Sequence, residues 1–218
     1  MNTRKFVMSY SCGKDSTLAL HKMIEMGHEP VALLVMVNID AGRSYFHGAD
    51  EKLLDEFSEA LGIPMILCPA KGEEYHLKFE AGLMEARKLG AEAACFGDID
   101  IEGNRKWSQD RCLNTGLRWE FPLWHMEREE VVRQIERAGY KCIIKAINNK
   151  ILPRNLLGRF IGSETAAAIK AYGADACGEN GEYHTIAVGG PAFKRPLRYR
   201  TGQILDFGDH SVIDINVF

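Results

Sequence analysis

The stretch SYSCGKDS, residues 9–16, lies between a short apolar run at 6–8 and a helical pattern at 17–26. A loop between a buried strand and a helix presents successive backbone N–H groups at the positive end of the helix dipole, which suits an anion. A glycine lets the backbone approach a ligand closely, serine hydroxyls can donate hydrogen bonds, and a lysine adds a positive charge. The residues that offer these properties here are Ser11, Gly13, Lys14 and Ser16. The junction is therefore predicted to bind phosphate, with a plain Ser/Asp helix cap as the alternative.

Two common nucleotide-binding patterns are absent from this junction. The Walker A pattern GxxxxGK[ST] requires a glycine five residues before Gly13, where the chain has Met8, and GxGxxG is not present either. The sequence therefore disfavours an ordinary P-loop ATPase and a Rossmann dehydrogenase.

Strand and helix signals alternate over the first two thirds of the chain. Strands are predicted at 5–10, 31–38, 64–69, 93–96 and 141–147. Helices are predicted at 17–26, 53–61, 73–89 and 127–138. Strands separated by helices of ten or more residues indicate right-handed βαβ units and a parallel sheet with helices on both faces. Ligands of such sheets bind beyond the carboxyl ends of the strands.

The pattern changes after residue 147. A Pro- and Gly-bearing stretch leads to a short helical segment at 163–173 and then to Gly-rich loops and short strands. We therefore expect a first α/β domain over 1–147 and a smaller α+β domain over 148–218.

Composition and charge restrict the class of protein. The 218 residues are 46% hydrophobic and carry a formal net charge of -3, which disfavours nucleic acid as a partner. The absence of a long apolar run or a secretory signal predicts a protein that does not enter a membrane and is cytoplasmic by default. The six cysteines form no CxxC pair, so structural zinc and a disulfide framework are not expected.

A second polar motif, CGENGEYHTIAVGGPAF, occupies residues 177–193. It places the titratable side chains of Glu179, Glu182 and His184 within six residues, among glycines that allow sharp turns. Carboxylates there could hold Mg²⁺, orient an amine or act as a base, and a histidine can carry a proton near neutral pH. A polar hairpin loop without a catalytic role is the alternative for this segment taken alone.

The two motifs together resemble those of a known family. SCGKDS is similar to the SGGxDS loop of the PP-loop ATP pyrophosphatases, and GENGEYHT followed by GPAF resembles the GExGEYHT and GPxF elements of the diphthine-ammonia ligases within that superfamily. Further family-like pieces follow the same order along nearly the whole chain: SYFH at 44–47, FGDI at 96–99, PLW at 122–124 and LGR at 157–159.

The resemblance implies a fold and an activity. The fold is the adenine nucleotide alpha hydrolase type, with a five-stranded parallel sheet that binds ATP and a C-terminal domain that contributes the substrate pocket. The activity is adenylation of a carboxylate by ATP with Mg²⁺, release of pyrophosphate, and displacement of AMP by ammonia. In that family the acceptor is diphthine on translation elongation factor 2. A homodimer is compatible with the sequence.

The resemblance also implies roles for individual residues. The phosphates of ATP would be surrounded by Ser11, Cys12, Gly13, Lys14, Asp15 and Ser16, with Asp15 either as a Mg²⁺ ligand or as an acceptor that orients the loop. The rest of the nucleotide site would include Val37, His47, Gly97 and Asp98. The catalytic residues would be Lys14, Glu179, Glu182 and His184.

Several residues have two interpretations. Cys12 stands where the SGGxDS loop has glycine, and its β-carbon would make a left-handed backbone less favourable. It is either a small residue at a glycine site or a nucleophile whose pKa Lys14 and the helix N-terminus lower. His47 either contacts ligand or packs its loop. The basic segment 194–200 is either a solvated strand edge or a docking surface. The polar loop at 100–112 covers ATP, forms a partner surface or is simply exposed.

Two other functions remain open from the sequence alone. One is modification of RNA, such as thiolation, or of another carboxylate substrate by a PP-loop enzyme; the isolated cysteines and the negative charge disfavour the RNA reaction. The other is a module that binds ATP as a sensor without turnover.

Overall fold

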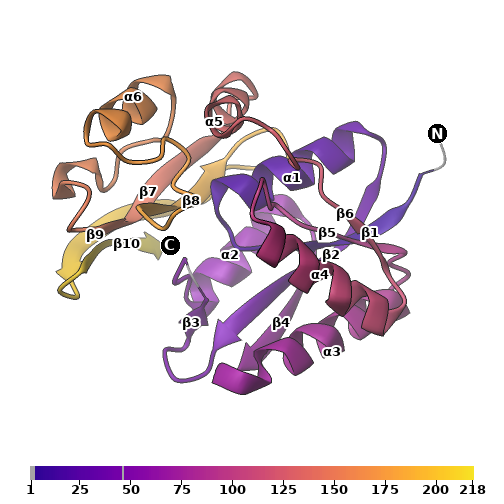
Figure 1. Ribbon diagram of the computed structural model, residues 1–218. Coiled ribbons are helices and arrows are strands. Elements are labelled where there is room, and N and C mark those ends of the chain that lie inside the picture. Colours follow the sequence, from indigo (N-terminus) through magenta and orange to yellow (C-terminus); the bar gives the residue numbers. More distant parts are fainter. Residues whose placement is uncertain (1–2, 46) are drawn as a thin grey trace.

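The computed structural model describes residues 3–45 and 47–218, which form two sheets with helices around them (Figure 1). The first sheet contains five parallel strands, in the order β4-β2-β1-β5-β6. Their bounds are β1 Lys5–Ser9, β2 Glu29–Asn38, β4 Met65–Ala70, β5 Ala93–Cys95 and β6 Arg118–Glu120. The predicted five-stranded parallel sheet is therefore confirmed.

Helices cover both faces of this sheet because successive residues of a strand point to opposite sides. Phe6 and Met8 of β1 pack in one apolar cluster with residues of α1 (Lys14–Glu25) and α2 (Glu51–Leu61). Val7, between them, packs in a second cluster with residues of α3 (Tyr75–Lys88), which follows the short 3-10 helix η1 (Gly72–Glu74). The middle of the central strand, Phe6 to Met8, is fully buried as a result.

A short strand, β3 (Arg43–Ser44), pairs antiparallel with the end of β2. One edge of β2 is occupied there by β4, which pairs with it from Leu33 to Asn38. On the other edge β1 pairs only as far as Leu34, so β3 lies on that edge beyond the end of β1. This arrangement brings His47 over the junction between β1 and α1.

The second sheet is antiparallel and has the order β8-β7-β10-β9. Its strands are β7 Lys141–Asn148, β8 Tyr183–Gly189, β9 Tyr199–Asp206 and β10 His210–Val217. With α5 (Arg128–Arg137), α6 (Ser163–Ala171) and the 3-10 helix η2 (Arg154–Leu156), it forms the part of the molecule at the upper left of Figure 1.

The sequence analysis predicted the strand at 141–147 as a member of the parallel sheet, and this was wrong. β7 pairs with β8 and β10 of the second sheet, whereas the fifth parallel strand is β6. β6 has only three residues, none of them fully buried, so it carries no hydrophobic pattern, while β7 is apolar and buried like a parallel strand. Sheet membership favours a division before α5, and the division of the chain into two functional domains stays a prediction.

The polar stretch predicted as a loop at 100–112 is a helix instead, α4 (Glu102–Thr115). The residues that it buries are Ser108, Cys112 and Thr115. Because these side chains are small and two of them are polar, the apolar periodicity that identifies a helix is missing. No helix in the described part of the chain is long and apolar enough to span a membrane.

Candidate active site

The motif predicted to bind phosphate lies at the carboxyl end of β1, where the chain turns into α1. This strand is central in the parallel sheet, between β2 and β5, and connections diverge from it in both directions. Such a point is where open α/β sheets bind ligands. Hydroxyl contacts brace the turn: the Oγ atoms of Ser11 and Ser16 lie 3.0 Å apart, and Ser16 Oγ donates to the carbonyl of Gly13 at 3.2 Å.

Cys12 adopts the left-handed backbone that glycine tolerates better, with φ of 66°. Its side chain is completely buried. Burial raises the pKa of the Cys12 thiol well above its ordinary value, so the thiol stays protonated at neutral pH. This disfavours the nucleophile interpretation of Cys12, because the thiolate is the reactive form.

The second sheet contacts this turn directly, through β8. The backbone N–H of Lys14 donates to Thr185 Oγ1 at 3.0 Å, and the backbone N–H of Ala187 donates to the carbonyl of Cys12 at 2.9 Å. The two sequence motifs, more than 160 residues apart, therefore lie side by side. The N–H of Lys14 is already engaged, so it does not contribute to the predicted amide cradle in this conformation.

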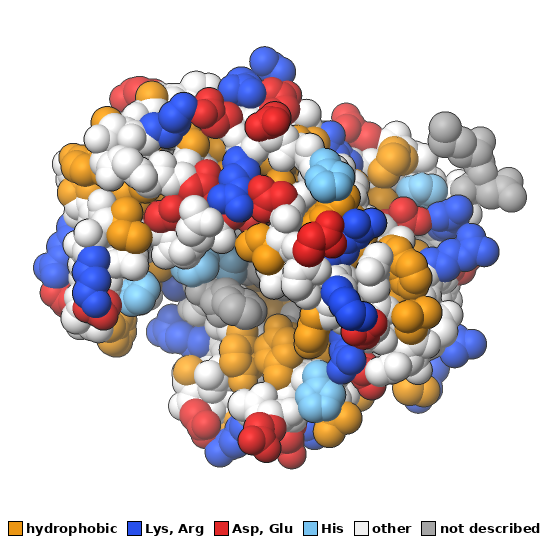
Figure 2. All heavy atoms as spheres, viewed as in Figure 1, with side chains coloured by type: hydrophobic (Ala, Val, Ile, Leu, Met, Phe, Trp, Pro, Cys, Tyr) orange, Lys and Arg blue, Asp and Glu red, His pale blue; other side chains and the backbone are white. Residues whose placement is uncertain are grey.

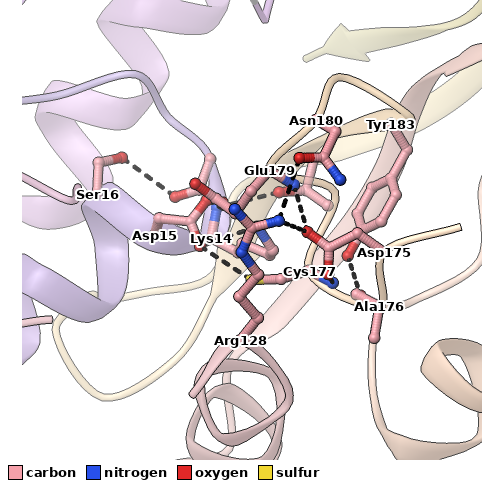
Figure 3. A network of polar contacts seen from close by, with 12 residues as sticks. Lys14, Asp15, Ser16, Arg128, Asp175, Ala176, Cys177, Glu179, Asn180 and Tyr183 are labelled. Atoms are coloured by element: carbon pink, nitrogen blue, oxygen red, sulfur yellow. Dashed lines mark hydrogen bonds and ion pairs between the residues drawn. The ribbon is translucent and has the colours of Figure 1, made fainter. Parts of the chain in front are cut away.

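Lys14, Asp15 and Glu179 form the charged centre of the site (Figure 3). Lys14 Nζ lies 2.7 Å from Asp15 Oδ2 and 3.7 Å from Glu179 Oε1. Burial alone would lower the pKa of the Lys14 ammonium, but the nearby negative groups, chiefly Asp15, hold that pKa well above its ordinary value. The buried ammonium is therefore charged at neutral pH and lies beside both carboxyl groups.

Glu179 has an unusual environment for a carboxyl group. Its side chain is only 16% exposed. Burial, together with the charge of Asp15, raises the pKa of Glu179 to about 7, although Lys14 and Arg128 act in the opposite direction. A carboxyl group with a pKa near neutrality can both accept and release a proton.

Glu182 points into its own loop rather than toward Lys14. Its carboxylate accepts hydrogen bonds from the backbone N–H groups of Asp175 and Asn180, each at 3.0 Å, and from Asn180 Nδ2 at 3.1 Å. These three donors occupy both oxygens. The geometry therefore favours a role in shaping the loop that carries Glu179 over the predicted catalytic role.

His47 lies over the phosphate-binding turn and beside His184. The two imidazole rings are edge to face, with centroids 5.1 Å apart, and a β-carbon at Gly13 would come within 2.4 Å of His47 Cε1. Nδ1 of His47 lies 2.7 Å from the carbonyl oxygen of Thr185, so this nitrogen must carry the proton and donate it. Burial and His184 lower the pKa of His47 to about 3, and the pKa of His184 is lowered too, chiefly by burial. Both rings are therefore neutral near pH 7.

Lys145 is a site residue that the sequence analysis missed. It projects from β7 with 3% of its surface exposed, and its ammonium donates to the carbonyl of Gly48 at 3.1 Å. It therefore ties the loop that carries His47 to the second sheet. Burial lowers the pKa of Lys145 to about 8. The lysine inside the apolar run KCIIKAI was the signal that could have revealed it.

We expect Lys145→Met to stabilise the protein at pH 7 by about 1–2 kcal/mol, since it removes a poorly solvated charge, less the lost bond to Gly48. The folded-state pKa lies below the ordinary value of 10.5. The charge of Lys145 therefore destabilises the wild type fully below pH 8, and this destabilisation disappears as the pH rises to 10.5. The difference in stability between Lys145→Met and wild type should decrease over that range. Urea denaturation at pH 7 and pH 10 measures this. Exposed Lys141 on the same strand is the control, and a Lys145→Met protein less stable than wild type at pH 7 would contradict the prediction.

A cleft on the first sheet lies next to the turn. Figure 2 shows a hollow near the middle of this face with hydrophobic side chains beside it. A cavity of about 90 Å³ is lined by the β1 end, Leu34–Met36, Ser44, Tyr45 and Tyr75. A second cavity of about 340 Å³ shares Ser9 and Tyr75 with the first and extends to Asp98 and Trp107. The two together form a continuous lining at the carboxyl ends of β1, β2 and β5.

The structure places the remaining predicted nucleotide contacts around this cleft in different ways. Asp98 lines the larger cavity, and burial raises its pKa to about 6. Gly97 packs against the backbone of the turn, where a β-carbon would come within 2.8 Å of the Ser16 nitrogen. Val37 lies in the register of β2 between Ser44 and Pro69 and lines neither cavity; Val35 and Met36 line the smaller one.

Two side chains of the family-like pieces PLW and LGR have structural contacts. The ring centroid of Trp124 lies 4.6 Å from the guanidinium carbon of Arg105. Arg159 pairs with Glu164 at 2.9 Å. In the basic segment, Arg195 pairs with Glu56 and Glu59 of α2, so part of its charge is already neutralised.

The chain is similar in sequence to known proteins of one family. Among curated proteins, diphthine–ammonia ligase of Rattus norvegicus is 25% identical, over 88% of this chain and 82% of its own. The Homo sapiens protein of the same name is 24% identical, over 89% and 82%. The Schizosaccharomyces pombe one is 20% identical over 95% of this chain but only 38% of its own. Two family models also match, the diphthamide synthase N-terminal domain at residues 4–119 and the C-terminal domain at 127–217. Because these two models in succession cover nearly the whole chain, the protein belongs to the diphthamide synthase family.

Proposed function

We propose that the protein is an ATP-dependent ligase that adenylates a carboxylate and transfers ammonia to it; the ammonia ligase part is supported by relatives that are named diphthine–ammonia ligase. The observation that carries this proposal is the 3.7 Å approach of Glu179 to Lys14. It joins a phosphate-binding turn to a carboxyl group with a shifted pKa in one site, as a two-step reaction of ATP and an amine requires.

The first step is attack of the acceptor carboxylate oxygen on the alpha phosphorus of ATP. The bond from that phosphorus to the bridging oxygen breaks, and pyrophosphate leaves with the electron pair. The ammonium of Lys14 is buried and charged, so it would stabilise the negative charge that develops on the leaving group. The hydroxyls of Ser11 and Ser16 lie beside it in the turn and would orient the phosphates.

The second step is attack of ammonia on the acyl carbon of the adenylate. The bond between the acyl carbon and the oxygen that bridges to phosphorus breaks, and AMP leaves with the electron pair. The nitrogen of the new C–N bond then carries an extra proton that a base must remove. Glu179, with a pKa of about 7 and a position beside Lys14, suits this role. His184 and His47 are neutral and would hold the acyl group by packing and hydrogen bonding rather than by charge.

The residues present fit Mg²⁺, which the family implies. Oxygen atoms of Asp15 and Glu179 and the sulfur of Cys177 lie within 4.8 Å of one another. Mg²⁺ prefers hard oxygen ligands and keeps several waters, so Asp15 would hold it, whereas Cys177 would not and Glu179 would stay free to act as the base. When bound, the ion would neutralise phosphate charge.

The acceptor that we propose is diphthine on elongation factor 2, and the cleft at Asp98 and Tyr75 is the proposed ATP site. The test is incubation of the protein with ATP, ammonium and diphthine-bearing elongation factor 2. We expect AMP, pyrophosphate and a product one mass unit lighter, since an acid OH becomes NH₂. Omission of ammonium is the control. Absence of AMP and of the mass change with all components present would refute the proposal.

A further inference from the structure

Arg128 joins three segments of the chain at one guanidinium group (Figure 3). It is the first residue of α5. Its Nε and Nη2 donate to the two carboxylate oxygens of Asp100, at 2.7 and 2.9 Å. Its Nη1 donates to Asp175 Oδ2 at 2.7 Å and to Asn180 Oδ1 at 3.2 Å. Bidentate arginine–carboxylate pairs of this kind fix orientation as well as contact.

Asp175, which is held by Arg128, in turn binds the backbone of the loop that carries Glu179. Its Oδ2 also accepts the backbone N–H of Glu179, and its Oδ1 accepts that of Cys177, each at 3.0 Å. The guanidinium thus holds the carboxylate that holds the backbone at Glu179. At the other end of the same residue, Glu179 Oε1 faces Lys14 Nζ.

The loop needs an external support. Gly178 and Gly181, on either side of Glu179, have φ of 75° and 85°. Glycine adopts this conformation readily, but it loses more backbone freedom on becoming ordered than any other residue. Asp100 follows Asp98 by two residues, in the connection between β5 and α4. Arg128 therefore ties a glycine-rich loop to the carboxyl end of the parallel sheet, where the phosphate-binding turn also lies.

We infer that Arg128 is a positioning residue of this site: through Asp175 it holds Glu179 against Lys14, and through Asp100 it joins this loop to the end of the parallel sheet. The inference rests on the proposed function for its kinetic part. Its structural part, the order of the loop at Cys177 and Glu179, can be measured without any turnover.

The first test compares Arg128→Gln with Arg133→Gln. Arg133 lies farther along α5 and pairs with Glu129 and Glu130 of its own helix, so it is a matched control. We expect Arg128→Gln to lower kcat for amide formation roughly tenfold to a hundredfold, with KM for ATP changed less than about threefold, because displaced catalytic groups cost rate more than binding. Arg133→Gln should leave both nearly unchanged. An equal loss in both variants, or a loss confined to KM, would overturn the inference.

The second test repeats Arg128→Gln in a Glu179→Gln background. If Arg128 acts through Glu179, its removal there should lower the residual kcat less than about threefold, since coupled residues are not additive. A full tenfold or larger loss in that background would show that Arg128 acts by another route.

The third test is hydrogen exchange at the backbone amides of Cys177 and Glu179. We expect both to exchange at least about tenfold faster in Arg128→Gln than in Arg133→Gln or wild type, because their acceptor Asp175 loses its support. Unchanged exchange would overturn the inference. If the wild type shows no ligase activity but exchange is still faster in Arg128→Gln, the proposed function is refuted and the positioning role stands.

Discussion

Replacing Lys14 with glutamine is expected to lower the rate of carboxylate-dependent pyrophosphate release from ATP about a hundred- to a thousandfold. The reason is that Lys14 is buried, charged and located at the turn where the phosphates would lie. Glutamine keeps a hydrogen-bond donor, on a side chain shorter by one bond, but has no charge. The loss should therefore fall on the step in which negative charge moves onto pyrophosphate, which a pyrophosphate-release assay measures directly.

Folding must be checked in this variant, because Lys14 lies between the carboxylates of Asp15 and Glu179. Removing one partner of a buried charge pair destabilises by roughly 3–5 kcal/mol. Circular dichroism and thermal denaturation establish whether the protein is folded at the assay temperature. Lys22→Gln, farther along α1, is the control with an equal change of charge. A folded Lys14→Gln protein that keeps more than about a tenth of the wild-type rate would exclude the proposed role.

Glu179→Gln is expected to separate the two steps of the reaction. Amide formation should fall by about a hundredfold or more, in the range that loss of a general base produces, because glutamine cannot remove a proton from the attacking nitrogen. Adenylation does not need that proton transfer, so exchange of labelled pyrophosphate into ATP should persist in the presence of the acceptor. Both activities can be followed in one reaction mixture.

The control for this variant is Glu164→Gln. The Glu164 side chain is 92% exposed and pairs with Arg159, so its loss should leave both activities within about twofold, as expected for surface substitutions. Equal losses of pyrophosphate exchange and amide formation in Glu179→Gln would move Glu179 from the ammonia step to the adenylation step.

Local pattern was a good guide to the parallel sheet and a poor one to its edge. The strands around the phosphate-binding turn are long or apolar, so their burial is visible in the residues themselves. β6 and α4 were missed because what they bury is short, small or polar. β7 was found but put in the wrong sheet, since an apolar run shows that a strand is buried but not which strands pair with it.

Some residues of the site could be identified from the sequence and others could not. Lys14, Asp15 and Glu179 were identified from two motifs, and the structure brings them together. The motif also included Glu182, whose carboxylate turned out to be occupied by its own loop. Nothing in the sequence marks Arg128 or Asp175, because an arginine at the start of a polar helix and an aspartate before a glycine-rich loop are common surface residues.

What the sequence by itself determined is the chemistry available: a strand, a phosphate-binding turn and a helix, and far downstream a glycine-rich loop with two carboxyl groups and a histidine. These are properties of residue type and local spacing, and they survive without knowledge of the fold. Only the tertiary structure decided which groups meet, which are neutral, and which hold others in place. Burial gives Glu179 a pKa near 7 and Lys145 one near 8, and the contact of β8 with the turn at Cys12 unites the site. Burial and long-range contact depend on how distant segments pack, which no local pattern records.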